Sequence, residues 1–313
     1  MSMPDLVSNR GASTPRRSPF RTLAKAAAIV LALCVVGTCI ALAFLAYQAT
    51  RRPTGRPDYV ALGSSYAAGS GLGERVGGAP FGCMRGNGSY PHLLARRLGL
   101  SLVDMSCSGA TASQVLNGGQ YFQGPQVAAV TAQTKLVTLT VGGNDLHYVG
   151  DLLGLAKRKD GGVVGWIAPR LLLASHTDPK RDANALGENI RAIVRTVRRK
   201  APSARIVIAT YPAILPEQGA CPLLRLTMDE AARMRALATT LAQTTRDAAH
   251  DAGATLVDMV TLGRDHDACS LSPWVNGAYA RSGDGGAFHP TRLGAASFAT
   301  SIASTLVQTR RGR

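Results

Sequence analysis

The sequence has 313 residues, of which 46% are hydrophobic and 17% are charged, a composition typical of a folded chain rather than a disordered one. The formal net charge is +16, but eight basic residues lie within positions 1–56, three more close the chain, and the remainder are spread out. Aromatic residues make up only 5% of the chain and do not alternate with a basic patch, so nucleic-acid binding is not expected.

The N-terminal segment predicts a membrane-spanning helix. Residues 26–47 carry no charge and are mostly apolar, and 22 such residues are long enough to cross a bilayer at about 1.5 Å per residue. The basic tail at 1–25 is expected to stay cytoplasmic, and residues 48–57 form a linker outside the membrane. We favour a retained signal anchor in a single-pass membrane protein.

A cleaved signal peptide is the alternative, and it would give a secreted protein. Its apolar region is typically about 7–15 residues long, shorter than the 22-residue span at 26–47. Ala41-Leu42-Ala43 nevertheless offers a small-residue cleavage site.

From residue 58 onward, short apolar strands alternate with helical patterns. Strands are expected at 59–62, 101–105, 136–141, 205–209 and 255–258, and helices at 90–98, 184–200, 228–251 and 293–307. This alternation predicts a three-layer α/β/α domain at 58–309, with a five-stranded parallel sheet covered on both faces. A short basic tail at 310–313 follows.

A serine follows the first expected strand at a tight turn. The apolar run 59–62 leads into Gly63, Ser64 and Ser65, and small residues that suit the start of a helix come next. Ser65 is therefore expected at the carboxyl edge of the sheet, where open α/β folds bind ligands, beside helix N–H groups that favour an anion. Because a lone serine before a helix is most often a cap, a nucleophilic serine requires partners elsewhere.

Two later segments supply such partners. The strand at 136–141 leads through two glycines to Asn144, whose amide could bind a developing oxyanion. His289 precedes Pro290 and is expected on a loop ahead of the last helix, where its near-neutral pKa suits a general base. Asp145 is expected to hold its loop by hydrogen bonds. Each block alone is more often a turn or a helix start, but the three together favour catalysis.

Neither a metal nor an organic cofactor is expected. The remaining histidines show no metal-ligand spacing to one another; they are His92, His147, His176, His250 and His266.

The blocks around Ser65, Asn144 and His289 resemble the SGNH (GDSL-type) serine hydrolases over about residues 58 to 309. The resemblance implies a flavodoxin-like SGNH hydrolase fold with Ser65 as nucleophile and His289 as base. It also implies an oxyanion hole made by the backbone N–H groups of Ser65 and Gly109 and the side chain of Asn144.

The chain departs from the family pattern at two positions. Ser64 stands where the family usually has aspartate, and Gly286 stands three residues before His289, where the family's acid usually lies. Some members of the secreted branch orient the imidazole with a backbone carbonyl, which Gly286 can provide. Asp284 is the competing candidate, although its spacing is wrong for the family. We expect the Gly286 carbonyl to orient the ring.

The cysteines indicate an exported domain. Two of the six lie in the apolar span, which leaves an even count of four in the domain and three possible pairings. The resemblance to secreted lipases favours Cys83–Cys107 and Cys221–Cys269.

The resulting interpretation is a serine ester hydrolase of carboxylesterase or lipase type, acting outside the membrane on a lipid, an acylated glycan or a small ester. Two alternatives stay open. An acyltransferase or deacylase acting on envelope glycans or lipids would share the acyl-serine intermediate. A catalytically inactive binding module would share only the fold.

Overall fold

The computed structural model describes residues 19–50, 55–163, 165–167 and 182–311. Most of the predicted basic tail at 1–25, residues 51–54 of the linker, and Gly312 and Arg313 of the C-terminal tail lie outside these residues, as does His176. The chain divides into two compact units, residues 1–46 and 47–313, and each is described by itself.

The first unit contains most of helix α1 (Pro19–Thr50). Within it, the 25 residues Leu23–Tyr47 are long and apolar enough to cross a bilayer, although a signal sequence near an N-terminus meets the same criterion. The helix extends beyond the predicted span 26–47 at both ends because the flanking polar residues are also compatible with helix.

The second unit is built on a parallel sheet of five strands in the order β2-β1-β3-β4-β5. The strands are β1 (Tyr59–Gly63), β2 (Leu102–Asp104), β3 (Leu136–Thr140), β4 (Arg205–Ala209) and β5 (Thr255–Val257). This sheet confirms the predicted fold class. Three strands are shorter than predicted: β2 lacks residues 101 and 105, β3 lacks residue 141 and β5 lacks residue 258.

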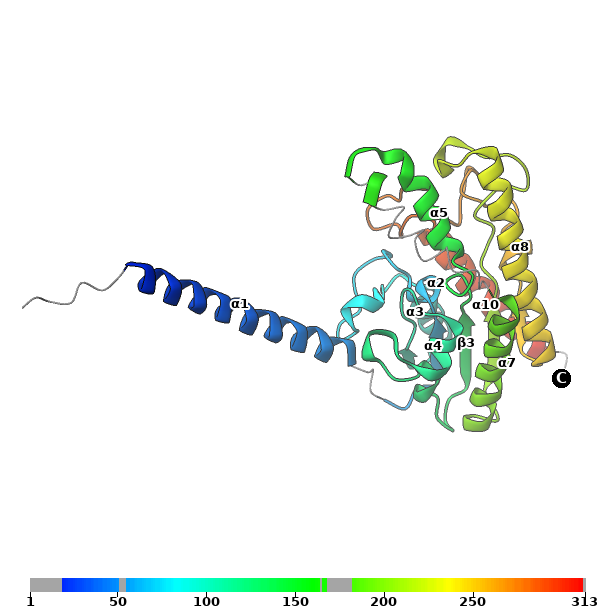
Figure 1. Cartoon of the computed structure of the whole chain (residues 1–313). Coiled ribbons are helices and arrows are strands. Elements are labelled where there is room, and N and C mark those ends of the chain that lie inside the picture. Colours follow the sequence, from blue (N-terminus) through cyan, green and yellow to red (C-terminus); the bar gives the residue numbers. More distant parts are fainter. Residues whose placement is uncertain (1–18, 51–54, 164, 168–181, 312–313) are drawn as a thin grey trace, which may run out of the picture. The chain divides into compact units, whose positions relative to one another are not determined.

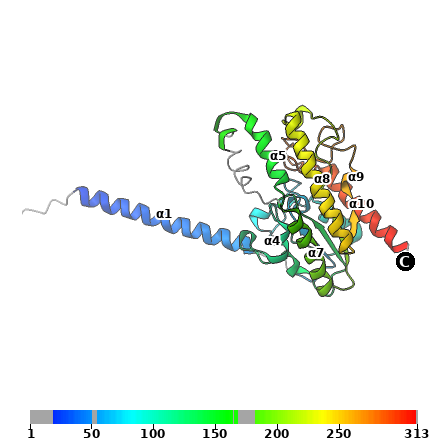
Figure 2. The same ribbon diagram turned by 45° about the vertical axis from the view of Figure 1, so that its right-hand side comes forward.

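Helices cover both faces of the sheet (Figures 1 and 2). Two of them pack together, α3 (Tyr90–Leu98) and α10 (Arg292–Arg311). A second group comprises α4 (Ala112–Asn117), α7 (Ala183–Lys200) and α8 (Met228–Asp251). Because both faces are covered, every residue of β1 and β3 is buried.

Further helices connect these elements. They are α2 (Ser65–Ala68), α5 (Tyr148–Lys157) and α9 (Met259–Leu262), together with single 3₁₀ turns at Phe81–Cys83, Gln120–Phe122, Gln126–Ala129, Arg158–Asp160 and Pro222–Leu224. Neither α4 nor α5 was predicted from the sequence. α4 begins with a capping box of Thr111 and Gln114, which is a start signal that can be read from the sequence.

The strand order reverses at β1, because β2 and β3 lie on its two sides. In open α/β sheets, ligands bind at the carboxyl ends of the strands at such a reversal. Ser65 follows β1 and Asn144 follows β3, so the sheet itself brings these two loops to one edge.

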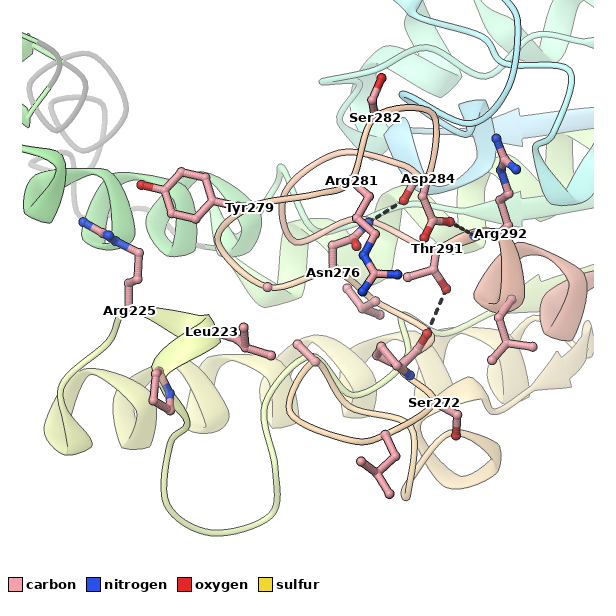
Figure 3. A pocket seen from close by; sticks show the side chains of 17 residues that line it. Leu223, Arg225, Ser272, Asn276, Tyr279, Arg281, Ser282, Asp284, Thr291 and Arg292 are labelled. Carbon is pink, nitrogen blue, oxygen red and sulfur yellow. Dashed lines mark hydrogen bonds between the residues drawn. The ribbon is translucent and has the colours of Figure 1, made fainter.

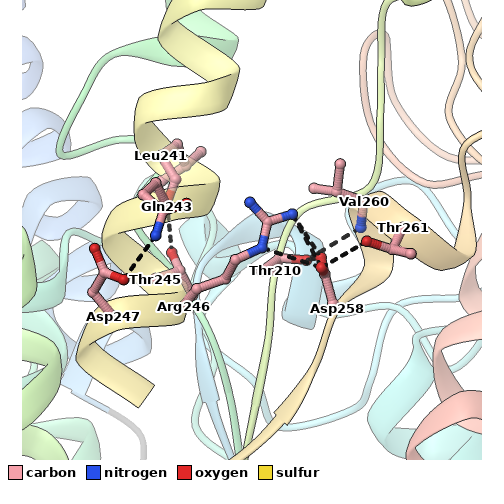
Figure 4. A network of polar contacts seen from close by, with 9 residues as sticks. All are labelled: Thr210, Leu241, Gln243, Thr245, Arg246, Asp247, Asp258, Val260 and Thr261. Carbon is pink, nitrogen blue, oxygen red and sulfur yellow. Dashed lines mark hydrogen bonds and ion pairs between the residues drawn. The ribbon is translucent and has the colours of Figure 1, made fainter. Parts of the chain in front are cut away.

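A polar network fixes the ends of β4 and β5 to helix α8 (Figure 4). The Arg246 guanidinium lies 3.0 Å from the Asp258 carboxylate, which also accepts hydrogen bonds from the hydroxyls of Thr210 and Thr261. Asp258 follows β5 and Thr210 follows β4. The network therefore holds the backbone immediately before Tyr211 in place.

The structure contains both predicted disulfides, Cys83–Cys107 and Cys221–Cys269. Cys34 and Cys39 in α1 are free. Each bridge ties two loops of the second unit together, and the first lies next to the segment that carries Gly109.

Candidate active site

Ser65 lies where β1 ends and the chain turns into α2. Gly63 makes this turn with a φ of +137°, and a β-carbon at this position would lie 2.2 Å from the carbonyl oxygen of Thr140 on β3. The Ser64 N–H then donates to that same carbonyl at 3.0 Å. The close approach of β1 and β3 thus fixes the start of α2, whose first residue is Ser65, only 5% exposed.

Gln126 holds the other side of this turn. Its side-chain oxygen accepts from the Gly63 N–H at 2.8 Å, and its side-chain nitrogen donates to the Gly63 carbonyl at 3.0 Å. The buried side-chain amide of Gln126 thus makes two hydrogen bonds to the backbone of Gly63 at the end of β1, as a residue of a neighbouring strand would. This role of Gln126 could not be predicted from the sequence, because the residue lies in an irregular segment with no periodic pattern.

His289 contacts Ser65 directly. Its Nε2 lies 2.7 Å from the Ser65 hydroxyl oxygen, and its Nδ1 lies 2.7 Å from the carbonyl oxygen of Ala287. A carbonyl can only accept, so Nδ1 carries the proton and Nε2 of the neutral ring is free to accept from the serine. The ring is thus set in the tautomer that a general base requires.

The carbonyl that orients the imidazole belongs to Ala287, so the prediction of the Gly286 carbonyl was wrong by one residue. The Gly286 carbonyl accepts instead from the backbone N–H of His289 at 3.1 Å. The reason is the left-handed conformation of Phe288, with a φ of +54°. It turns the chain so tightly that the carbonyl two residues before His289 faces its ring.

Asp284 does not contact the imidazole through its carboxylate. Its Oδ1 accepts from the backbone N–H of Arg292, the first residue of α10, at 2.7 Å (Figure 3). A carboxylate at a helix N-terminus is favourable in its own right. Its backbone carbonyl accepts from the Asn276 side chain at 2.6 Å. Asp284 therefore braces the loop that carries His289.

Asn276 and Asp284 also line a cavity of about 1040 Å³ behind this loop, shown in Figure 3. Its lining, within the part of the chain that the structure describes, contains neither Ser65 nor His289. The cavity is thus separate from the reacting groups.

Gly109 and Asn144 lie in adjoining loops. The Asn144 side chain donates one of its two N–H groups to the Ala110 carbonyl at 2.9 Å, which leaves the second available. Gly109 adopts a φ of +84°, as glycine readily does. Within the described chain, the backbone N–H groups of Ser65 and Gly109 donate no hydrogen bond to the rest of the protein.

Asp145 holds this region together, as the sequence predicted. Its two carboxylate oxygens lie 2.9 and 3.0 Å from the N–H of Ala112, the first residue of α4. Burial raises the pKa of Asp145 to about 6, against the opposing effect of that hydrogen bond. In the described residues, no group of three or more acidic, histidine or cysteine side chains could hold a metal ion.

Comparison with known proteins gives the class of this fold and site. Residues 61–296 match the GDSL-like lipase/acylhydrolase family. The chain is 34% identical to Lipase 2 of Streptomyces coelicolor over 238 residues, which cover 74% of this chain and 79% of the relative. It is 28% identical to the lipase of Streptomyces rimosus over 277 residues, or 88% of this chain and 94% of that one.

Comparison with solved structures supports the same family. The crystal structure of the extracellular lipase from Streptomyces rimosus has a TM-score of 0.61 at 25% identity, over 79% of this chain and 98% of that one. Phospholipase A1 from Streptomyces albidoflavus gives the same TM-score and coverage at 27% identity. The chain therefore belongs to the GDSL-like lipase/acylhydrolase family and is an SGNH hydrolase of the esterase and lipase type.

The protonation of His289 predicts the pH dependence of turnover. Burial lowers the pKa of His289 below its usual 6.5, although the hydrogen bond to Ala287 opposes this shift. Because the base must be neutral, kcat/KM for a soluble ester should rise with pH through a midpoint below 6.5 and stay level to about pH 8.

The carboxyl group of Asp145 titrates in the same range, with a pKa of about 6, so the profile is measured in Asp145→Asn as well. The rising limb should persist in this variant if it belongs to His289. A limb that disappears with Asp145, or one centred above pH 7, would contradict the assignment.

Proposed function

We propose that the protein hydrolyses carboxylic esters through an acyl-serine intermediate formed on Ser65. The observation that carries this proposal is the continuous line of contacts from the Ser65 hydroxyl through His289 to the Ala287 carbonyl, with 2.7 Å at each step. The names of the relatives, lipases and a phospholipase A1, favour a lipid ester as substrate.

The first half of the reaction acylates the serine. The Ser65 oxygen attacks the ester carbonyl while its proton passes to Nε2 of His289. Negative charge then develops on the carbonyl oxygen, which accepts from the backbone N–H groups of Ser65 and Gly109 and from the second N–H of Asn144. When the tetrahedral intermediate collapses, the C–O bond to the alcohol breaks and Nε2 returns the proton to the departing alkoxide.

The second half releases the acid. A water molecule gives its proton to Nε2 and adds to the acyl carbonyl, and collapse of that intermediate returns the proton to Ser65. Throughout, the Ala287 carbonyl accepts from Nδ1 and stabilises the transient imidazolium by its dipole. A neutral carbonyl does this without a buried carboxylate, whose desolvation would be costly.

We further propose that the catalytic domain lies outside the cell, attached by α1 as a single-pass anchor. The two disulfides support export, and the length of the apolar segment Leu23–Tyr47 supports a retained anchor.

Mass mapping of the N-terminus in the membrane fraction tests this proposal. An intact segment 26–47, with residues 60–309 digested by protease added to intact cells, is expected. A mature N-terminus near Ala43 would show a signal peptide instead.

Ser65→Ala should abolish both ester turnover and labelling by a fluorophosphonate, because the attacking oxygen is lost. The matched control is Ser64→Ala, which removes the neighbouring hydroxyl but keeps the nucleophile, so labelling should continue. Circular dichroism checks that both variants are folded. Labelling that survives in Ser65→Ala would place the nucleophile elsewhere.

Asp284→Asn and His289→Ala, compared in one turnover assay, test whether a carboxylate is required. Asparagine keeps an oxygen that can accept from the Arg292 N–H, so Asp284→Asn should retain most of the turnover. His289→Ala should lose about a thousandfold or more, because the base is removed. Comparable losses in the two variants would show that Asp284 acts on the imidazole after all.

A further inference from the structure

Two buried tyrosines lie between the parts of the active site. Tyr66 directly follows Ser65, and Tyr211 follows β4 at the same edge of the sheet. Their ring centroids are 4.0 Å apart, and the Tyr66 ring lies 5.3 Å from the imidazole of His289. Neither hydroxyl takes part in the reaction steps proposed above.

Tyr66 holds the backbone that orients the base. Its hydroxyl donates to the carbonyl of Phe288 at 2.6 Å, and both side chains are buried. Phe288 has the left-handed conformation that residues with a β-carbon rarely adopt, so this turn depends on its surroundings. The turn places the Ala287 carbonyl against the imidazole. By holding this turn, the Tyr66 hydroxyl influences the direction in which the His289 ring points.

Tyr211 joins the nucleophile turn to the oxyanion loop. Its hydroxyl oxygen lies 2.7 Å from that of Ser64, the residue before the nucleophile. The same hydroxyl packs against Gly143, the residue before Asn144. A β-carbon on Gly143 would lie 2.9 Å from the Tyr211 hydroxyl, so the close packing of this ring requires glycine there.

Both hydroxyls remain protonated in the working range of pH. Burial raises the pKa of Tyr66 and Tyr211 above the usual 10.0. Tyr66 therefore stays a donor to the Phe288 carbonyl. Tyr211, whose hydroxyl also keeps its proton, can donate that proton to the Ser64 hydroxyl.

We propose that Tyr66 and Tyr211 are positioning residues of the hydrolytic site. Tyr66 sets the direction of the His289 imidazole through the Phe288 carbonyl, and Tyr211 sets the nucleophile turn against the oxyanion loop through Ser64 and Gly143. The contact between the two tyrosine rings links the part of the site that orients His289 to the part that holds the nucleophile turn and the oxyanion loop. This inference rests on the proposed function, because it assigns both residues to the same reaction.

The first test compares Tyr66→Phe with Tyr59→Phe in the full chain, using a soluble ester. Tyr59 is a matched control: its buried hydroxyl lies 2.7 Å from that of Thr138, within the sheet and remote from the reacting groups. Both substitutions delete one buried hydroxyl, so urea unfolding should show similar losses of stability. Only Tyr66→Phe should lower kcat, by about tenfold or more with KM within about twofold, because a misdirected base slows the chemical step without altering binding.

The second test is a double-mutant cycle of Tyr211→Phe and Ser64→Ala. Each substitution breaks the same hydrogen bond from one end. The double variant should therefore lose no more kcat than the worse single variant, whereas independent effects would multiply. This cycle tests the Tyr211 half of the proposal by itself, so the proposal stays falsifiable if Tyr66→Phe does not fold.

Two results would overturn the proposal: equal kcat in Tyr66→Phe and Tyr59→Phe, or multiplicative losses in the double-mutant cycle. Fluorophosphonate labelling of the unsubstituted chain separates this failure from a failure of the proposed function. If the nucleophile is misassigned, the label is absent from Ser65 in the unsubstituted chain. If only the tyrosine roles are wrong, Ser65 is labelled in the unsubstituted chain and one of the two overturning results is found in the variants.

Discussion

The site depends on one backbone constraint, the left-handed turn at Phe288. A residue with a β-carbon pays for a φ of +54° with strain on the order of 1–3 kcal/mol, and such a turn persists only where the surrounding structure imposes it. Here the Phe288 N–H donates to the Gly277 carbonyl at 2.9 Å and its ring is fully buried. The Asn276 side chain donates to the Asp284 carbonyl in the same loop.

The turn explains how the imidazole of His289 is oriented by a group other than a carboxylate. An imidazole base needs an acceptor at Nδ1 to fix its tautomer, and in many serine hydrolases that acceptor is a carboxylate. The tight turn brings the Ala287 carbonyl to Nδ1 instead, within the same loop as the base. Orientation of the base is thus a local property of residues 287–289. The carboxylate of Asp284 is free to accept from the first N–H of α10.

The proposed nucleophile and oxyanion donors depend on longer-range contacts. Parallel pairing of β1 and β3 brings their carboxyl ends together. The hydrogen bond from the Ser64 N–H to the Thr140 carbonyl continues this pairing to the residue just before Ser65. Asn144 and Gly109 are joined through the Ala110 carbonyl. The sheet therefore positions these groups, whereas the C-terminal loop positions the base.

Much of this arrangement could be predicted from the sequence. Strand and helix periodicity gave the order of elements, because buried parallel strands and long helices have strong patterns. Ser65, Asn144 and His289 could be found because each lies next to a recognisable strand or proline. Tyr211 follows β4 at the same edge, so the rule that located Ser65 and Asn144 could have located it too.

The remaining contacts could not be predicted in this way. Whether Ala287 or Gly286 faces the imidazole depends on one φ angle, at a phenylalanine that no propensity assigns to the left-handed region. The pairing of Gln126 with Gly63 joins residues 63 positions apart and leaves no periodic signal. Such contacts are set by tertiary packing, which local sequence does not encode.

A crystal structure of the full chain with a phosphonate bound to Ser65 would test the central claim most directly. The phosphonyl oxygen is expected within about 3.2 Å of the N–H groups of Ser65 and Gly109 and of the Asn144 side chain. Nδ1 of His289 is expected to face the Ala287 carbonyl still. A phosphonyl oxygen turned away from these donors, or an imidazole turned toward the Asp284 carboxylate, would contradict it.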